Sequence, residues 1–368
     1  MMLRRFFIIP VLALGIAGCT TLVARDETGV IIARRAQIRS SIAVVAADLK
    51  EVERGEMVEI LGSDTAENGE QWLRVRTFDG ERVEGWIEAR NVMSQEMLNR
   101  SRKLAEEDKD VPAQATGQLR ASTNLRLTPD RSTVDNIMMK LDSGATFEIV
   151  GWKYVPKPKS SEATDIDDAP KPGSAQRNPN RRSKESDEPK GPEETNELWY
   201  KVRLAKTISP APAGWLYGKQ VELTVPGDII FYRTGREFVA WCRLDDEAAG
   251  KTATKDKDAA KDGKPGSWVI LEKSSSRDRS ATDEPDFDRI YVLGYDESRE
   301  EHYTAYRSAD VNGRLPLRVG GSGVNKYFTV NILQDNQIKQ ARYNVTRDEK
   351  GLLHVEAAND VAKGRKKR

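Results

Sequence analysis

The residue types that most often carry out covalent or metal chemistry are scarce in this chain. It contains two cysteines and two histidines, namely Cys19, Cys242, His302 and His354. A cysteine nucleophile needs a histidine base nearby in space, whereas Cys242 lies in the apolar stretch VAWCRL, which predicts a buried strand. A catalytic zinc site needs three good ligands, and the two histidines do not supply them. The sequence therefore predicts a protein that is not an enzyme and has no metal and no cofactor.

The context of Cys19 indicates a different kind of chemistry. Residues 1–18 carry Arg4 and Arg5 near their start, continue as the apolar run FFIIPVLAL and end in Ile-Ala-Gly. A charged start followed by an apolar run too short to span a bilayer is typical of an export signal. The closing quartet, Ile16 to Cys19, resembles the lipobox of bacterial lipoproteins, with isoleucine where leucine is usual.

The lipobox resemblance implies that the signal is cleaved after Gly18 and that the Cys19 thiol is acylated. Several acyl chains anchor a protein stably because each buried methylene contributes about 0.8 kcal/mol. The residue after the cysteine is Thr20 rather than aspartate. In an organism with two membranes this favours the outer membrane, facing the periplasm. Cys242 is left without an intramolecular partner, so no disulfide is expected.

Composition indicates folded modules separated by solvated segments. The chain is 38% hydrophobic and 32% charged, and its 59 basic residues nearly cancel its 58 acidic ones. That balance gives no overall basic field of the kind that recruits nucleic acid. Four segments rich in proline, lysine or acidic residues cannot bury enough apolar surface to fold: 156–197, 247–267, 273–286 and the basic tail 358–368.

Residues 94–108 predict a helix. Ser94 can cap it, and an apolar face follows that neither glycine nor proline interrupts: Met97, Leu98, Ser101, Leu104 and Ala105. It would connect two β-rich regions, within a linker at 94–116.

The chain contains one small module twice. EGWIEARNV at 84–92 matches AGWLYGKQV at 213–221, QWLRVR matches LWYKVR, and MVEILG matches TFEIVG. The short alternating runs are typical of half-buried strands, and Gly55 and Gly144 suit turns with positive φ. About five strands in 60 residues predict a small barrel. The Gly-Trp phrase is expected to form the last strand of each copy.

Both copies resemble the bacterial SH3-like (SH3b) domain, over residues 28–93 and 117–224. The first copy lacks the usual Pro-Ser turn in AQIRSSIAVVAADL, and the second carries the 156–197 stretch as an insertion in one loop. Closure entropy grows slowly with loop length, so a hairpin tolerates such an insertion. The resemblance implies modules without catalysis that bind peptidoglycan or its stem peptides, or that pack beside an enzyme as adaptors.

Aromatic residues supply the candidate binding groups. We expect the Gly-Trp pairs, Gly85-Trp86 and Gly214-Trp215, to hold the cores of the modules. For Trp72 and Trp199 two roles stay open, core packing or stacking on a sugar or peptide ligand. Two further aromatic residues of the second copy are candidates for ligand binding, Tyr200 and Tyr217. At the position of Tyr217 the first copy has Glu88.

Residues 225–357 predict a third β domain, a sandwich or a closed barrel of about nine strands. The stretch GDIIFYRTGREFVAWCRLDD predicts a hairpin that turns at Thr234-Gly235, and RVGGSGVNK predicts another turn. The whole chain is therefore expected to be all-β. Its expected function is that of a membrane-anchored envelope lipoprotein that binds peptidoglycan or a wall-associated partner. The alternative is a structural lipoprotein that acts through protein–protein contacts in an envelope or secretion complex.

Overall fold

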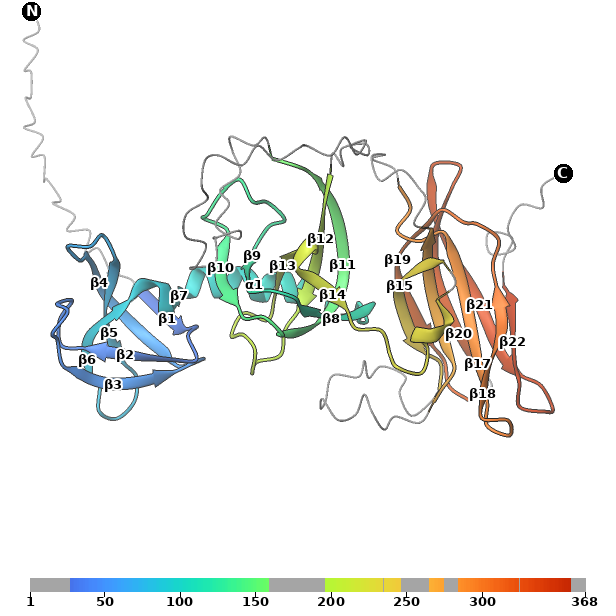
Figure 1. Ribbon diagram of the computed structural model, residues 1–368, viewed down its shortest axis with the longest axis horizontal. Coiled ribbons are helices and arrows are strands. Elements are labelled where there is room, and N and C mark those ends of the chain that lie inside the picture. Colours follow the sequence, from blue (N-terminus) through green and yellow to red (C-terminus); the bar gives the residue numbers. More distant parts are fainter. Residues whose placement is uncertain are drawn as a thin grey trace, which may run out of the picture.

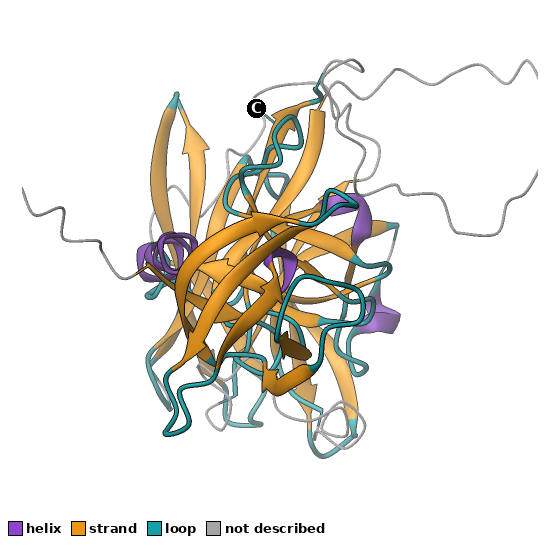
Figure 2. Cartoon of the chain, turned by 90° about the vertical axis from the view of Figure 1, so that its left-hand side faces the viewer, coloured by secondary structure: helices purple, strands orange, loops and turns teal. Residues whose placement is uncertain are grey.

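The structure is a computed structural model that describes residues 27–158, 196–233, 235–245, 265–274, 284–323 and 325–358. The expected all-β class is confirmed, since antiparallel strands make up most of these residues. Three β domains follow one another in a row (Figure 1), and Figure 2 shows how few helical segments lie among the strands.

Module one extends from Glu27 to Ser94 and forms one curved seven-stranded sheet in the order β3-β2-β6-β5-β4-β1-β7. Its strands are β1 Glu27–Ile31, β2 Arg35–Arg39, β3 Asp48–Glu53, β4 Met57–Thr65, β5 Gln71–Thr77, β6 Glu84–Glu88 and β7 Val92–Ser94. Alternate residues from these strands fill a small core: Ile31, Ala36, Ile38, Val52, Val58, Val75 and Ile87.

Module two extends from Ala115 to Leu223 and has the same strand order, β10-β9-β13-β12-β11-β8-β14. Its strands are β8 Ala115–Leu119, β9 Thr123–Arg126, β10 Ile137–Leu141, β11 Thr146–Pro156, β12 Asn196–Arg203, β13 Ala213–Tyr217 and β14 Val221–Leu223. The matching order shows that the sequence repeat is also a structural repeat. Gly55 and Gly144 have φ of 92° and 79°, as the turns at these positions were predicted to require.

The Gly-Trp phrase forms the next-to-last strand of each module, not the last. After β6 and β13 a short 3-10 turn follows, η1 Ala89–Asn91 and η2 Gly218–Gln220, and the chain then returns as β7 and β14. These two strands pair with β1 and β8. Each module is therefore closed by a three-residue strand that the sequence pattern did not reveal.

The predicted helix is confirmed as α1, Gln95–Glu107, with the Ser94 side chain accepting a hydrogen bond from the Met97 amide. It is packed between the modules and is more than a spacer. Ser101 is fully buried, and its hydroxyl donates to the Ala213 carbonyl oxygen at 2.6 Å. Leu98 joins a core that also contains side chains from both modules.

The third domain, Arg236 to Ala357, is a sandwich of two four-stranded antiparallel sheets. One sheet contains β15 Arg236–Arg243, β16 Trp268–Ser274, β17 Arg289–Asp296 and β18 Glu301–Arg307. The other contains β19 Gly313–Gly320, β20 Lys326–Gln334, β21 Gln337–Arg347 and β22 Leu353–Ala357. Both sheets contribute to one core, which includes Leu271, Phe287, Phe328 and Tyr343. Of the two expected forms, a sandwich or a closed barrel, the third domain is a sandwich.

The hairpin predicted at Thr234-Gly235 is wrong. Ile230–Tyr232 form a 3-10 turn, η3, because the Tyr232 amide donates to the Ile229 carbonyl oxygen at 3.0 Å. The other predicted turn is confirmed, since β19 and β20 pair across the glycine-rich segment between Gly320 and Lys326.

The segments predicted to be unfolded are shorter than expected wherever the structure describes their ends. Glu197 lies in β12 and is buried against Arg131, and Lys273 lies in β16 and is buried against Glu284. Ion pairing of these side chains explains why charged residues continue the strands. The central parts of these segments, 159–195, 246–264, 275–283 and 359–368, lie outside the described residues, as do residues 1–18 and Cys19.

Candidate functional site

The Gly-Trp glycines let neighbouring strands approach closely. A Cβ on Gly85 would lie 2.6 Å from the Arg39 carbonyl oxygen, and one on Gly214 would lie 2.5 Å from the Met138 Cε. At these distances a larger side chain would force the neighbouring atoms to move. The glycine of each pair is therefore structural, as the sequence predicted.

The tryptophans of the Gly-Trp pairs are less buried than those one strand earlier. Trp86 and Trp215 are half-buried on the outer face of their strands, so the expectation that they anchor the cores is wrong. Trp72 and Trp199 are 4% and 1% exposed. Of the two roles left open for them, the structure supports packing, because so little of either ring faces solvent.

Trp199 is buried on the outer face of the sheet, on the side of the loop between β9 and β10 that contains Arg131. Its ring lies 5.6 Å from that of Tyr217, and the Arg131 guanidinium lies 4.5 Å above the Tyr217 ring. Arg131 in turn pairs with the buried Glu197 carboxylate. Tyr217 is itself 6% exposed. Trp199 and Tyr217 are thus packed residues, and the structure does not place them at an open binding surface.

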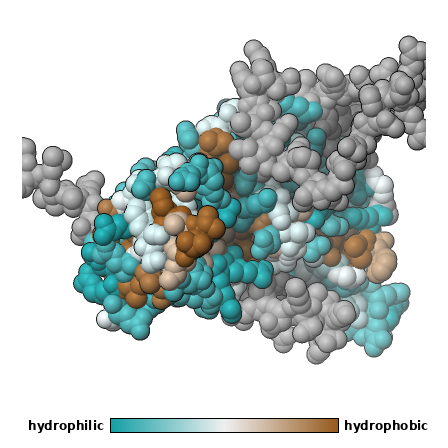
Figure 3. Space-filling model, turned by 60° about the vertical axis from the view of Figure 1, so that its left-hand side comes forward, coloured by the Kyte–Doolittle hydropathy of each residue, from teal (hydrophilic) through white to brown (hydrophobic). Residues whose placement is uncertain are grey.

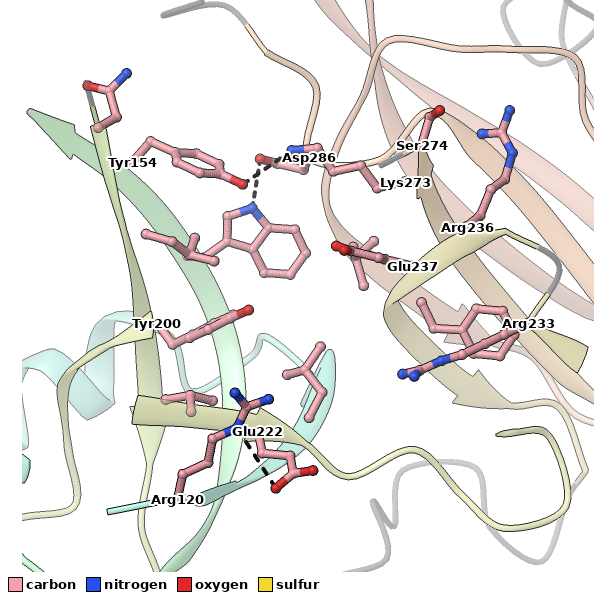
Figure 4. A pocket seen from close by; sticks show the side chains of 17 residues that line it. Arg120, Tyr154, Tyr200, Glu222, Arg233, Arg236, Glu237, Lys273, Ser274 and Asp286 are labelled. Atoms are coloured by element: carbon pink, nitrogen blue, oxygen red, sulfur yellow. Dashed lines mark hydrogen bonds and ion pairs between the residues drawn. The ribbon is translucent and has the colours of Figure 1, made fainter. Parts of the chain in front are cut away.

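Tyr200 is the one sequence candidate that lies at a cavity. A cleft of about 410 Å³ opens between module two and the third domain, within the size range of ligand pockets. On one side the long β11–β12 hairpin contributes Trp152, Tyr154 and Tyr200; on the other, β15 and β16 contribute Arg236, Glu237, Lys273 and Ser274. Figure 4 shows Tyr154 and Tyr200 projecting from module two toward the charged side chains of the third domain.

Hydrogen bonds fix the aromatic side of the cleft. The Trp152 indole N–H donates to Asp286 Oδ1 at 3.1 Å, while Asp286 Oδ2 accepts from the Leu315 amide at 2.9 Å. Trp152 and Tyr200 meet edge to face with ring centroids 6.3 Å apart. Burial raises the pKa of the Asp286 carboxyl above its usual range, and these donors partly offset that shift. Since all three rings are half-buried, part of each is left to contact a ligand.

The polar side of the cleft carries both charge signs. Lys273 contacts the Tyr154 hydroxyl at 3.2 Å and the Glu284 carboxylate at 3.0 Å. Arg120 lies 3.9 Å from Glu222. Arg233 is exposed and lies over the Phe238 ring at 5.6 Å, and among the described residues it pairs with no carboxylate. Arg233 is therefore the cation at this cleft that is best placed to take an anionic group from a ligand.

Sequence reasoning missed Trp152 and Tyr154. They stand in GWKYVP, directly before the long insertion, and their alternation continues the strand that begins at Thr146. That period-2 pattern of aromatic residues was the available signal. The pattern alone did not indicate a binding site, because the third domain that covers these residues begins some eighty positions later.

A second, larger cavity of about 780 Å³ lies between the same two domains. Two of its aromatic side chains already have partners. The Arg342 guanidinium lies 3.7 Å from the Tyr327 ring centroid, and the Trp268 indole N–H donates to Asp228 Oδ2 at 2.8 Å. We regard the first cleft as the candidate site because it combines the sequence candidate Tyr200 with the exposed Arg233.

The cysteine and histidine of the third domain show no activated arrangement. The Cys242 thiol contacts the Arg243 carbonyl oxygen at 3.8 Å, and burial raises the pKa of this thiol to about 11. A reactive thiol would have a lowered pKa. His302 Nε2 contacts the Gly266 carbonyl oxygen at 2.8 Å and packs against Tyr232 and Tyr295. Within the described residues no group of three histidine, cysteine or carboxylate side chains is arranged to hold a metal ion.

No family model and no curated protein matches this chain. Two solved structures share a very weak likeness with it, NlpC2 and NlpC1 from Trichomonas vaginalis, each at 9% identity and a TM-score of 0.15. The first alignment covers 91% of this chain and 93% of the other, and the second covers 76% and 87%. None of the helices in the described part of the chain has the length and apolar character needed to cross a bilayer.

Proposed function

We propose that this protein is an envelope lipoprotein, anchored by acylation of Cys19, that binds cell-wall peptidoglycan without catalysis. The binding site in this proposal is the cleft between module two and the third domain. The observation that carries the proposal is the combination of three half-buried aromatic rings with Arg233, whose guanidinium pairs with no carboxylate among the described residues.

The chemistry of this cleft suits a sugar that carries a short peptide. The faces of Trp152, Tyr154 and Tyr200 offer apolar surface to a sugar ring or an aliphatic side chain. Arg233 offers charged donors to a carboxylate, and a guanidinium bonds a carboxylate more strongly than a neutral donor does. Glu237 and Glu222, on the same cleft, supply acceptors for an amine or for sugar hydroxyls.

Co-sedimentation of the soluble region, residues 20–368, with insoluble peptidoglycan tests the proposal. We expect binding that Tyr200→Ala and Arg233→Ala each weaken by about tenfold, which corresponds to ~1.4 kcal/mol. The matched control is Trp86→Ala, which removes a half-buried tryptophan from module one, and we expect it to bind like the wild type. If the wild-type chain stays in the supernatant at low salt, the binding proposal is wrong.

Replacing Cys19 by serine tests the anchor separately. The variant is expected to leave the membrane fraction, because its single acylation site is lost. Retention of Cys19→Ser in membranes would contradict the anchoring proposal and would leave the cleft result unaffected.

A further inference from the structure

Module one presents an apolar patch that no other described residue covers. The loop between β2 and β3 contains the run Ile-Ala-Val-Val-Ala-Ala at 42–47, and Val44 and Val45 are 92% and 94% exposed. Leu49 and Phe78 are also exposed, at 46% and 58%. Figure 3 shows apolar side chains gathered on module one where this view brings it forward. We call Val44, Val45, Leu49 and Phe78 the apolar patch.

Ion pairs tie β3, which contains Leu49, to the turn that contains Phe78. Lys50, next to Leu49, bonds both Asp79 and Glu81 in the turn that follows Phe78. Soluble proteins seldom leave such apolar side chains grouped at the surface unless they contact another surface.

The loop of the patch is held in shape by a cation. The Arg39 guanidinium donates to the carbonyl oxygens of Val44 and Ala46 at 2.8 and 3.1 Å, and it lies 5.8 Å from the Trp72 ring centroid. The Ser40 amide adds a hydrogen bond to the Ala47 carbonyl oxygen at 2.9 Å. The backbone is thereby fixed without burying the valines, whose side chains are left pointing outward.

The β2–β3 loop, with Val44 and Val45, lies at the end of module one at which Glu27 begins β1. Residues Glu27, Ile60, Val75 and Gly85 form one row across the sheet, and Gly62, Arg74, Trp86 and Arg39 form the next row. The loop thus begins one row beyond Glu27. Figure 1 places this loop at the left end of the molecule, away from module two. From Cys19 to Glu27 the eight residue steps can extend no more than about 29 Å.

We propose that the apolar patch docks on the phospholipid surface in which Cys19 is anchored. The proposal rests on the proposed function for its anchor. The charged side chains around the patch are already paired, Arg39 with Asp48 and Lys50 with Asp79 and Glu81, so the contact is made by the apolar side chains and depends little on anionic lipid. The anchor supplies a high effective concentration, which makes a contact of this small size sufficient.

The experiment uses the full acylated chain in vesicles of phosphatidylethanolamine and phosphatidylglycerol. A polarity-sensitive fluorophore is attached to Val45→Cys in a Cys242→Ala background, and brominated lipid is the quencher. The matched control is the same fluorophore at Val134→Cys, in the equivalent loop of module two, where Val134 is 45% exposed. We expect brominated lipid to reduce emission at least twofold at position 45 and to leave position 134 unchanged.

Three results would overturn the docking proposal. If brominated lipid reduces emission equally little at both positions while the protein stays on the vesicles, the patch does not reach lipid although the anchor holds. Shielding of position 45 from iodide without vesicles means that a second copy covers the patch. Release of the acylated chain from vesicles means that the anchor itself fails, and the docking fails with it.

Discussion

The two modules share one framework, yet their first long loops behave in opposite ways. Arg39 and Arg126 occupy the same position, each opposite the tryptophan of the Gly-Trp pair. In module one the Arg39 side chain is 22% exposed and supports an open apolar loop. In module two Arg126 is fully buried and donates to the Thr133 carbonyl oxygen and to Asn136 Oδ1, both at 2.8 Å.

The long hairpins of the two modules differ in the same sense. At the tip of β4–β5 the residues Ser63 and Thr65 are exposed. The equivalent positions on β11 are Trp152 and Tyr154, which line the cleft. The repeat thus preserves strand order and the close approach at glycine, while loops and hairpin tips have diverged. In our account module one faces the membrane and module two, with the third domain, faces the ligand.

The buried tryptophans provide the largest expected difference between the modules. Trp199→Ala should cost about 4–5 kcal/mol and Trp72→Ala about 3 kcal/mol, since deleting a large aromatic side chain leaves a cavity. Trp199 is the more costly because it lies beneath Tyr217 and a closed loop, whereas Trp72 lies beneath one guanidinium. Urea unfolding followed by circular dichroism measures both. A larger loss for Trp72→Ala would contradict the account of the two loops.

The two Gly-Trp glycines should differ in their tolerance of a methyl group. A Cβ at Gly85 would meet a backbone carbonyl oxygen, which moves only with its strand, whereas one at Gly214 would meet the flexible ends of Met138 and Leu125. We expect about 3 kcal/mol for Gly85→Ala and about 1 kcal/mol for Gly214→Ala, within the range for overpacked sites. Thermal unfolding of the two variants gives the comparison. Equal losses would show that Met138 cannot move aside.

The smallest expected difference between the modules concerns their stability at low pH. The hydrogen bond from Lys50 lowers the pKa of Asp79 from 3.8 to about 2. A carboxyl group with a lowered pKa stabilises the fold above the unfolded value, and that contribution is lost as the pH falls through 4 to 2. Module two has Lys206 at the equivalent position. Urea midpoints between pH 2 and pH 5 should therefore fall less steeply for Asp79→Asn than for the wild type, and parallel curves would contradict this.

Much of the fold could be predicted from the sequence because its signals are local. The strand QWLRVRT, the helix capped at Ser94 and the turn at Gly55 each depend on periodicity or on one residue's conformational preference. The burial of Trp72 and Trp199 could not be predicted in this way. Each lies on the outer face of its strand, and only the tertiary path of a loop decides whether that face is covered.

The candidate site was predictable only in part for a related reason. Tyr200 was recognised as an aromatic residue of the repeat, but a cleft needs two surfaces. Its second surface comes from β15 and β16, which follow in a domain whose placement no local pattern fixes. Arg233 was missed because its segment was predicted to be the arm of a hairpin rather than a turn beside the cleft.

The most direct test of our central claim compares equivalent positions in the two modules. Tyr200 in module two and Leu73 in module one occupy the same place on their strands, one residue after the buried tryptophan. Calorimetric titration of the mature chain with soluble peptidoglycan fragments should show binding that Tyr200→Ala weakens by about tenfold, ~1.4 kcal/mol, and that Leu73→Ala leaves unchanged. Loss of affinity in Leu73→Ala, with Tyr200→Ala binding like the wild type, would contradict the claim that the cleft of module two is the binding site.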